Sequence, residues 1–441
     1  MKTRIASVLL IILAVLFIPA GCRKIDWINH SDDHNPIPPV FVSGEVPLAW
    51  LNLAITLART TPGFTGPVTS RSFGYIGLAL YESVVPELKD YKSIQKQLNG
   101  LPTLPKPDKY KYNIYAVSAN AALATMVHNM YGNASAAQNF TIDSLQNVFD
   151  LKFKSYISTA DFDRSAKFGK DIANAIYDWS KTDGGDKGYL NVFPPGYTIP
   201  TGPGLWTPLP GQGAQHAFWG TNRTFVAGNT ANFSIKEPPA YSIDPNSDYY
   251  KEELEVYNES INQDPEHRTI ALYWAAIPPP TVSISILSAV LKDQKASLAK
   301  AAESYCRLGM AISDAFIVCY KAKYKYSQER PISYIRANFN STWSPLIGTP
   351  PFPDYLSAHS VQTGAAATVL AGIFGNNTTF TDYSINDLGF TPRTFTKFSD
   401  YAYEVGLSRI YGGIHIRSSD FIGLDQGTLI GENIMDLHFG H

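Results

Sequence analysis

The chain has 441 residues, of which 44% are hydrophobic and 17% are charged, so it is long enough to bury a large core. Its formal net charge of -2 excludes a global positive field of the kind that draws proteins to nucleic acids. Any anion-binding site must therefore be local. Length alone allows one large domain or two to three of ordinary size.

The first 22 residues have the pattern of a bacterial lipoprotein signal peptide. A basic start (MKTR) precedes an apolar stretch, and small residues lead to Cys22 in the sequence PAGC. We expect residues 1–22 to direct export and Cys22 to carry a lipid that anchors the chain in the cell envelope, in the periplasm or at the outer membrane surface. A plain cleaved signal or a short membrane anchor is the alternative. Residues 23–44 are polar and contain prolines, which predicts a flexible tether.

From Val46 onward, apolar residues recur at three- and four-residue spacing, which predicts an all-α protein of the helical-bundle type. No stretch alternates polar and apolar residues for long enough to predict a sheet. We expect a single domain over residues 45–441. The predicted helices lie near residues 47–60, 70–85, 112–131, 137–153, 160–181, 248–261, 265–276, 299–330, 359–375, 394–413 and 421–435.

Two further expectations follow from these helices. Asp161 is placed to cap the helix near residues 160–181. Cys306 and Cys319 are separated by roughly 20 Å along one continuous helix, which is too far for a disulfide, so both should be buried thiols.

Residues 183–245 interrupt the helical pattern, because glycine, proline and polar residues dominate there. A loop of this length inside a compact chain usually has a function or covers part of the structure. One interpretation of the chain is therefore a non-catalytic surface lipoprotein that binds glycan or protein through the aromatic residues of this loop.

Three stretches in the last third of the chain carry basic residues and histidines. In KYKYSQERP, Lys323 and Arg330 lie two turns apart on one helix face, about 10 Å along the axis, and Pro331 places Arg330 at the helix end. Taken alone, basic residues at a helix C-terminus are common because they interact favourably with the helix dipole.

The second stretch is PPFPDYLSAHS. Ser357 can cap a helix that starts near His359, and the first backbone amides of such a helix attract an anion. His359 is a candidate acid or base. In the third stretch, SRIYGGIH, Arg409 lies in the last turn of a helix and His415 lies beyond two glycines, which permit a turn that points both side chains at one pocket.

Together the three stretches supply three positive charges, a serine hydroxyl, several amides and two histidines. Guanidinium groups match the oxygens of a tetrahedral oxyanion, and an imidazole nitrogen can bond its central atom. The combination therefore predicts an oxyanion site.

The order Lys-x6-Arg-Pro, Ser-x-His and Ser-Arg-x5-His resembles the signature shared by vanadium-dependent haloperoxidases and the superfamily of type 2 phosphatidic acid phosphatases and bacterial acid phosphatases. ERPISYIR, with a second arginine at Arg336, resembles the haloperoxidase form, as do PPFPDYLSAHS and the tryptophan-containing segment at residues 204–225. The resemblance covers roughly residues 200–435 and is greatest to bacterial iodo- and bromoperoxidases.

The resemblance implies a helical haloperoxidase with vanadate as cofactor, which oxidises iodide or bromide with hydrogen peroxide to hypohalous acid. His415 would be the axial ligand of vanadium. His359 would take a proton from hydrogen peroxide, Lys323 would polarise the peroxide, and Phe352 would line the halide side. The groups implied to contact the vanadate oxygens belong to Lys323, Arg330, Ser357, Ala358 and Arg409.

Several positions depart from the family pattern. Ala358 replaces the usual glycine, Leu356 the usual proline, and Tyr320 an aromatic residue that is often tryptophan. Ser419 stands where the phosphatases carry an aspartate four residues after the histidine, and Asp420 follows one place late.

A further departure concerns Arg409. Some members carry a carboxylate near this arginine in the stretch that corresponds to LYWAAIPPP, and residues 275–277 provide none. The orientation of Arg409 is therefore open at this point.

The same residues also fit an acid phosphatase. Phosphate would occupy the vanadate site, His415 would attack the phosphorus of a small phosphoester, and His359 would protonate the leaving alcohol. Membrane-spanning lipid phosphatases are disfavoured, because no later segment offers about 20 uncharged apolar residues. Contact with a membrane is therefore expected through the lipid anchor only.

Overall fold

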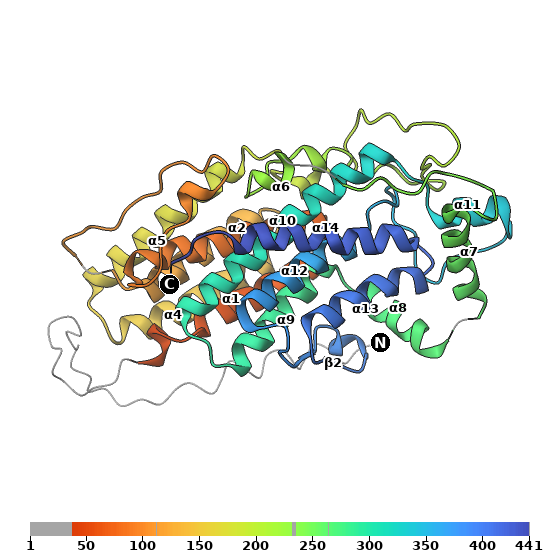
Figure 1. The fold of residues 1–441 in the computed structure, drawn as a ribbon. Coiled ribbons are helices and arrows are strands. Elements are labelled where there is room, and N and C mark those ends of the chain that lie inside the picture. The colour runs from red at the N-terminus through yellow and green to blue at the C-terminus, as the bar shows by residue number, and fades with distance from the viewer. Residues whose placement is uncertain (1–37, 112, 232–234, 263, 441) are drawn as a thin grey trace.

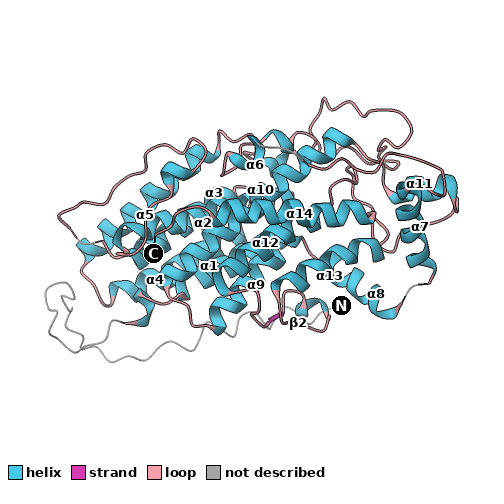
Figure 2. Ribbon diagram, in the orientation of Figure 1, coloured by secondary structure: helices cyan, strands magenta, loops and turns pink. Residues whose placement is uncertain are grey.

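The computed structural model describes residues 38–440 apart from 112, 232–234 and 263. The predicted signal peptide, Cys22 and most of the predicted tether lie outside these residues, so those interpretations stay predictions. The described residues form 14 α-helices and two short strands, which confirms the all-α prediction (Figure 2).

Most of the long helices lie side by side along the length of an elongated bundle (Figure 1). Strands β1 (Phe380–Asp382) and β2 (Arg393–Phe395) form an antiparallel pair in which Phe380 lies opposite Phe395. The helices are α1 (Glu45–Thr60), α2 (Gly66–Val84), α3 (Tyr115–Met130), α4 (Ala136–Lys154), α5 (Thr159–Ser180), α6 (Gly228–Ala231), α7 (Asp248–Ile261), α8 (Pro265–Ala275), α9 (Pro279–Asp293), α10 (Leu298–Tyr326), α11 (Pro331–Asn338), α12 (Ala358–Phe374), α13 (Phe398–Tyr411) and α14 (Arg417–Met435).

Helix α10 is the centre of the bundle, because it packs against α2 and against α12 and is buried over most of its 29 residues. Small residues allow these helices to approach closely. A Cβ atom on Gly309 of α10 would lie 2.5 Å from the carbonyl oxygen of Phe73 in α2. On the far side of α12, a Cβ atom on Gly427 of α14 would lie 2.1 Å from the carbonyl oxygen of Val361. These tight contacts fix where the helix ends lie.

The end of α10 differs from the prediction. The helix stops at Tyr326, Ser327 adopts the left-handed conformation with φ 47°, and Arg330 is an extended residue (φ -89°, ψ 151°) that precedes α11. The expectation that Lys323 and Arg330 share one helix is therefore wrong. The physical reason is Pro331, which disfavours helical conformation in the residue before it and is suited to the first position of a new helix.

Three smaller expectations concern the cap of α5, the two cysteines and residues 183–245. Ser158, not Asp161, caps α5, since the Ser158 hydroxyl accepts from the Asp161 amide at 3.1 Å. Cys306 and Cys319 are buried free thiols, as predicted. Residues 183–245 are largely irregular, as predicted, and contain three short helical elements: Gly188–Leu190, Trp219–Thr221 and α6.

Helices α9 and α11 were not among the predicted helices, although each begins with a proline at its first position. Among the described residues, no single helix has both the length and the apolar character to cross a membrane. The pair α8 and α9, bent by 92°, meets the length and composition criteria jointly.

We predict that Gly427→Ala destabilises the fold by about 1–3 kcal/mol, because the new methyl group would overlap the backbone of α12. Gly348→Ala is the matched control, since a Cβ atom there meets nothing within 4 Å and the backbone φ is not positive. Urea unfolding of both variants measures the difference. Equal midpoints for the two variants would contradict the close packing of α12 and α14.

Candidate active site

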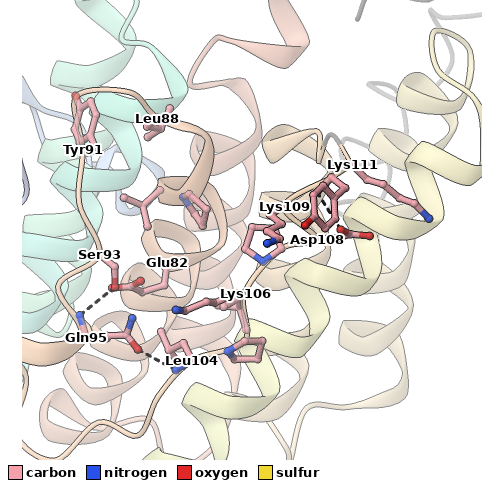
Figure 3. Close-up of a pocket in the computed structure, with 16 residues that line it drawn as sticks. Glu82, Leu88, Tyr91, Ser93, Gln95, Leu104, Lys106, Asp108, Lys109 and Lys111 are labelled. Atoms are coloured by element: carbon pink, nitrogen blue, oxygen red, sulfur yellow. Dashed lines mark hydrogen bonds between the residues drawn. The ribbon is translucent and has the colours of Figure 1, made fainter.

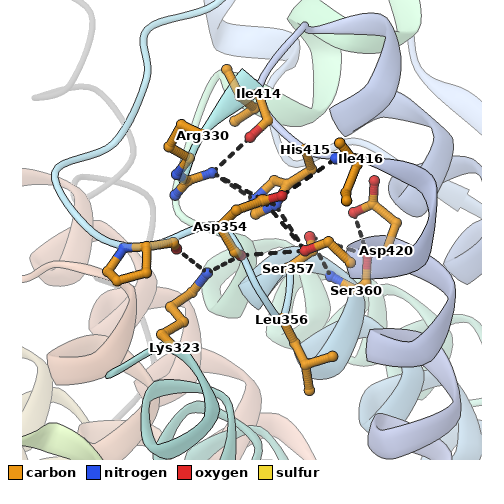
Figure 4. A network of polar contacts seen from close by, with 12 residues as sticks. Lys323, Arg330, Asp354, Leu356, Ser357, Ser360, Ile414, His415, Ile416 and Asp420 are labelled. Carbon is orange, nitrogen blue, oxygen red and sulfur yellow. Dashed lines mark hydrogen bonds and ion pairs between the residues drawn. The ribbon is translucent and has the colours of Figure 1, made fainter. Parts of the chain in front are cut away.

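The three predicted stretches converge where helix ends meet. Lys323 lies near the C-terminal end of α10, Ser357 caps the N-terminal end of α12, and Arg409 lies in the last turn of α13. His415 precedes α14, and Arg330 precedes α11 (Figure 4). All five side chains are buried or nearly so. The sequence interpretation of one shared site is therefore supported by their positions.

The turn between Arg409 and His415 depends on glycine as expected. Gly413 adopts φ +78°, and the Ile414 amide donates to the Arg409 carbonyl at 3.1 Å, which reverses the chain. A Cβ atom on Gly413 would also lie 2.9 Å from Cβ of Pro345. The turn returns His415 to the region of Arg409 and Arg330.

Lys323 is held by two backbone carbonyls. Its Nζ donates to Pro353 at 2.9 Å and to Asp354 at 2.7 Å, and it lies 4.9 Å from the centre of the Phe352 ring. An ammonium group has three donors, so one remains for a ligand. Burial lowers the pKa of Lys323 to about 7, because desolvation disfavours its charged form.

Both arginines have a buried N–H group without a partner. Arg330 donates through Nε to the Phe352 carbonyl at 2.8 Å and through Nη1 to the Ile414 carbonyl at 2.7 Å, whereas its Nη2 has no partner. Arg409 donates through Nη1 to Trp274, and its Nε has no partner. Buried polar groups are normally satisfied, so these orphaned donors indicate an anion site.

The contacts of His415 fix which nitrogen carries its proton. Nδ1 contacts the Asp354 carboxylate and lies 3.2 Å from the Ser419 hydroxyl, while Nε2 lies 3.1 Å from Nη1 of Arg330, which can only donate. We therefore assign the proton to Nδ1 and the lone pair to Nε2, facing the cationic groups. Burial and then the neighbouring positive charges lower the pKa of His415 well below its ordinary value, so the ring is neutral.

The start of α12 has the predicted capped geometry. The Ser357 hydroxyl accepts from the Ser360 amide at 3.5 Å, and Ser360 donates to Asp420 at 2.9 Å. Ala358 is the first helical residue and is not among the non-glycine residues with positive φ. The methyl group that replaces the usual glycine therefore requires no left-handed backbone.

His359 and Arg409 share one acceptor. Both hydrogen-bond to the backbone carbonyl of Trp274, near the C-terminal end of α8. Backbone carbonyls at a helix C-terminus carry partial negative charge, so this contact favours the positive charge of Arg409. Burial and the charge of Arg409 lower the pKa of His359 well below its ordinary value, which favours the neutral ring.

A pocket of about 370 Å³ opens onto His359 and Arg409. Much of its lining is apolar or aromatic. The larger side chains of this kind belong to Pro67, Ile277, Phe316, Tyr320, Ile347, Pro350 and Phe352. Tyr320 and Phe352 pack together with ring centres 5.5 Å apart, so the residue that often is tryptophan in the family remains part of the aromatic wall.

A larger pocket of about 780 Å³ lies at the other end of α2, lined by Glu82 and by residues 104–111 (Figure 3). Gly66 lines the pocket beside His359, so the length of α2 separates the two by about 25 Å. None of the predicted site residues lines this larger pocket.

Sequence reasoning missed two carboxylates and one carbonyl. The motif PPFPDYLSAHS contains Asp354 without indicating a role for it, and Asp420 lies one residue beyond the position of the phosphatase aspartate. The Trp274 contact is made by its backbone oxygen, which every residue type has, so the sequence cannot predict it. The Asp354 carboxylate lies 3.6 Å from Nη1 of Arg330. Burial raises the pKa of Asp354 to about 6 and the pKa of Asp420 well above its ordinary value.

Comparison with known proteins supports this geometry. A family model described as the second helical-bundle domain of VCPO matches residues 303–440, which include the residues predicted to contact the oxyanion. A crystal structure described as the first bacterial vanadium-dependent iodoperoxidase is 30% identical, covers 92% of this chain and 98% of its own, and has a TM-score of 0.82. The chain belongs to the vanadium-dependent haloperoxidase family.

A more distant likeness concerns the fold alone. The holo and apo forms of a bacterial vanadium-dependent chloroperoxidase are 15% and 14% identical to this haloperoxidase, each with a TM-score of 0.66. They cover 86% and 85% of this chain and 93% of their own. No curated protein matches. The family membership establishes the chain as an enzyme that oxidises halide, and it favours the haloperoxidase interpretation over the non-catalytic lipoprotein.

We predict that the haloperoxidase, freed of any bound cofactor, binds sulfate more weakly as the pH rises from 6 to 8. Lys323 loses its charge through a pKa of about 7, while Asp354 gains one above about 6. Sulfate does not titrate in this range, so calorimetric affinities at several pH values report the protein alone.

Lys323→Met should weaken sulfate at pH 6 and flatten the dependence on pH. An affinity that rises with pH in the unaltered protein would contradict the assignment of Lys323 as a cation of the site.

Proposed function

We propose that this haloperoxidase uses vanadate as its cofactor at the convergence of α10, α12, α13 and α14, and that it oxidises iodide with hydrogen peroxide, with bromide as a poorer substrate. The observation that carries the proposal is the neutral His415, whose Nε2 lone pair faces Nη1 of Arg330, in a site where Arg330 and Arg409 each keep another buried donor without a partner. That donor set suits an oxyanion whose central atom accepts a nitrogen ligand.

The residues present fit vanadate. Nε2 of His415 would bind vanadium, and the oxygens would be held by cations, a hydroxyl and an amide. These groups belong to Lys323, Arg330, Ser357, Ala358 and Arg409. When bound, vanadium(V) would supply Lewis-acid activation of the peroxide without changing oxidation state.

Lys323 and the two arginines provide positive charge on side chains that are almost completely buried. Backbone carbonyls accept from Nε and Nη1 of Arg330 and from Nη1 of Arg409, which restricts the orientation of both guanidinium groups. Preorganised donors of this kind stabilise developing negative charge without rearrangement during the reaction. The remaining proton of Lys323 can be donated to an oxygen at the site.

His359 is the group that takes the proton from hydrogen peroxide. It lines the open pocket, its ring is neutral, and the Trp274 carbonyl fixes one of its nitrogens. The other nitrogen is then available as acceptor. A base in this position contributes typically about 10²–10⁴-fold to the rate.

The preference for iodide follows from the pocket walls. An anion that approaches along Phe352 and Tyr320 exchanges water for aromatic and apolar side chains, and fixed protein groups must replace its hydration shell. Among iodide, bromide and chloride, iodide has the lowest charge density and therefore loses the least hydration free energy. The similar protein of known structure is described as an iodoperoxidase, which points the same way.

We predict that the protein loaded with orthovanadate has a kcat/KM that falls in the order iodide, bromide, chloride. Formation of oxidised halide with hydrogen peroxide is measured for each, and hydrolysis of a phosphomonoester is measured in parallel. Robust phosphatase turnover with no halide oxidation would overturn the proposal and favour the acid phosphatase alternative.

Substitution of the two site histidines should separate their roles. His359→Ala should lower kcat for iodide by about 10²–10⁴-fold and still bind vanadate, because it removes the base and not the ligand. His415→Ala should lose both iodide oxidation and vanadate binding. His128→Ala is the control, since His128 pairs with Asp143 at the surface of α3. Full activity in His415→Ala would refute the site.

We also propose that residues 45–441 form one domain, which residues 23–44 tether to a lipid on Cys22 at the cell envelope. The support is the signal-like sequence for the anchor, and for the single domain the packing of α10 against both α2 and α12. In bacterial cells fed labelled palmitate, the full chain should incorporate label and sediment with membranes, and Cys22→Ala should do neither. Label in Cys22→Ala would contradict the anchor.

A further inference from the structure

Asp354 has no role in the sequence motifs of the family, yet it contacts the central histidine. It lies between α11 and α12, is fully buried, and its carboxylate contacts Nδ1 of His415. We propose that Asp354 is the positioning residue of His415, which holds the imidazole proton on Nδ1 and turns the Nε2 lone pair toward the oxyanion pocket. The inference rests on the proposed vanadate site.

The carboxylate comes from a different segment than the phosphatase pattern predicts. That pattern places an aspartate four residues after the histidine, where this chain has Ser419. The Ser419 hydroxyl is within 3.2 Å of Nδ1 and donates to the Asp354 carbonyl at 3.3 Å. Ser419 therefore contacts both members of the Asp354–His415 pair, and the carboxylate comes from the segment between α11 and α12.

Asp354 is itself fixed on several sides. Its amide donates to the Gln328 carbonyl at 2.9 Å, its carbonyl accepts from Lys323 at 2.7 Å, and its Oδ2 accepts from the Ile416 amide at 3.5 Å. These bonds tie it to the chain that follows α10 and to the residue before α14. The carboxylate is consequently placed before any ligand arrives.

The chemical consequence is on the ligand nitrogen. A histidine that binds a metal usually donates its other N–H to a carboxylate or carbonyl, which fixes the tautomer and ring orientation and raises the basicity of the ligand nitrogen. Loss of such a partner typically costs about 10–100-fold in metal affinity. An asparagine in its place can donate to Nδ1 and favour the wrong tautomer.

Titrations with two anions distinguish a role of Asp354 in positioning His415 from a purely electrostatic role and from a role in folding. Vanadium can accept a bond from Nε2, whereas phosphate is held by charge and hydrogen bonds alone. Calorimetric titration of the cofactor-free full chain with orthovanadate, and separately with inorganic phosphate, measures both affinities. Asp354→Asn should lower the affinity for vanadate by about 10–100-fold. The affinity for phosphate should stay unchanged or rise, because the substitution removes one negative charge.

Two outcomes of the Asp354→Asn titrations would overturn the proposal. Equal losses for both anions would show a merely structural role, and an unchanged vanadate affinity would show no role. Glu329→Gln is the matched control, since Glu329 is a neighbouring buried carboxylate that accepts from Tyr249 and not from His415. Wild-type protein that binds phosphate but not vanadate would refute the proposed cofactor, and with it this role.

Two further measurements address the mechanism directly. In ¹⁵N-histidine NMR of the cofactor-free protein, the signal absent from His415→Ala should show the proton on Nδ1, and a proton on Nε2 would overturn the proposal. Asp354→Ala/Ser419→Asp moves the carboxylate to the phosphatase position and should recover part of the vanadate affinity that Asp354→Ala loses. Recovery of this kind distinguishes a carboxylate effect from a packing effect.

Discussion

The site depends on the burial of three cations with too few partners. The side chains of Lys323, Arg330 and Arg409 are almost completely buried, and burial of charge is costly unless it is compensated. Two carboxylates and several backbone carbonyls compensate part of the charge and fix its geometry. The remaining donors are left for an anion, which gives the pocket its affinity and explains why so many helix ends are brought to one place.

The backbone carries much of this arrangement. Carbonyls of Pro353 and Asp354 hold Lys323, those of Phe352 and Ile414 hold Arg330, and Trp274 holds Arg409 together with His359. Such contacts are set by where segments lie and not by side-chain identity. The identities of the residues that supply these carbonyls therefore carry little of the information about the site.

The sequence predicted the helical class and the three motif stretches because apolar periodicity and motif spacing are local properties. It also predicted the Gly413 turn, whose conformation only glycine adopts readily. The partners of His415 could not be predicted, since Asp354 lies 61 positions earlier and its approach depends on how α11, α12 and α14 pack. The break between Lys323 and Arg330 could have been predicted more closely from Pro331, which disfavours a helical Arg330 and is the first residue of α11.

The most direct test of the account is where vanadium binds. Crystals of the protein soaked in orthovanadate should give an anomalous vanadium peak next to Nε2 of His415, in contact with the side chains of Lys323, Arg330 and Arg409. A vanadium peak elsewhere in the bundle, or an ordered His415 pocket that stays free of vanadium at saturating orthovanadate, would contradict the central claim.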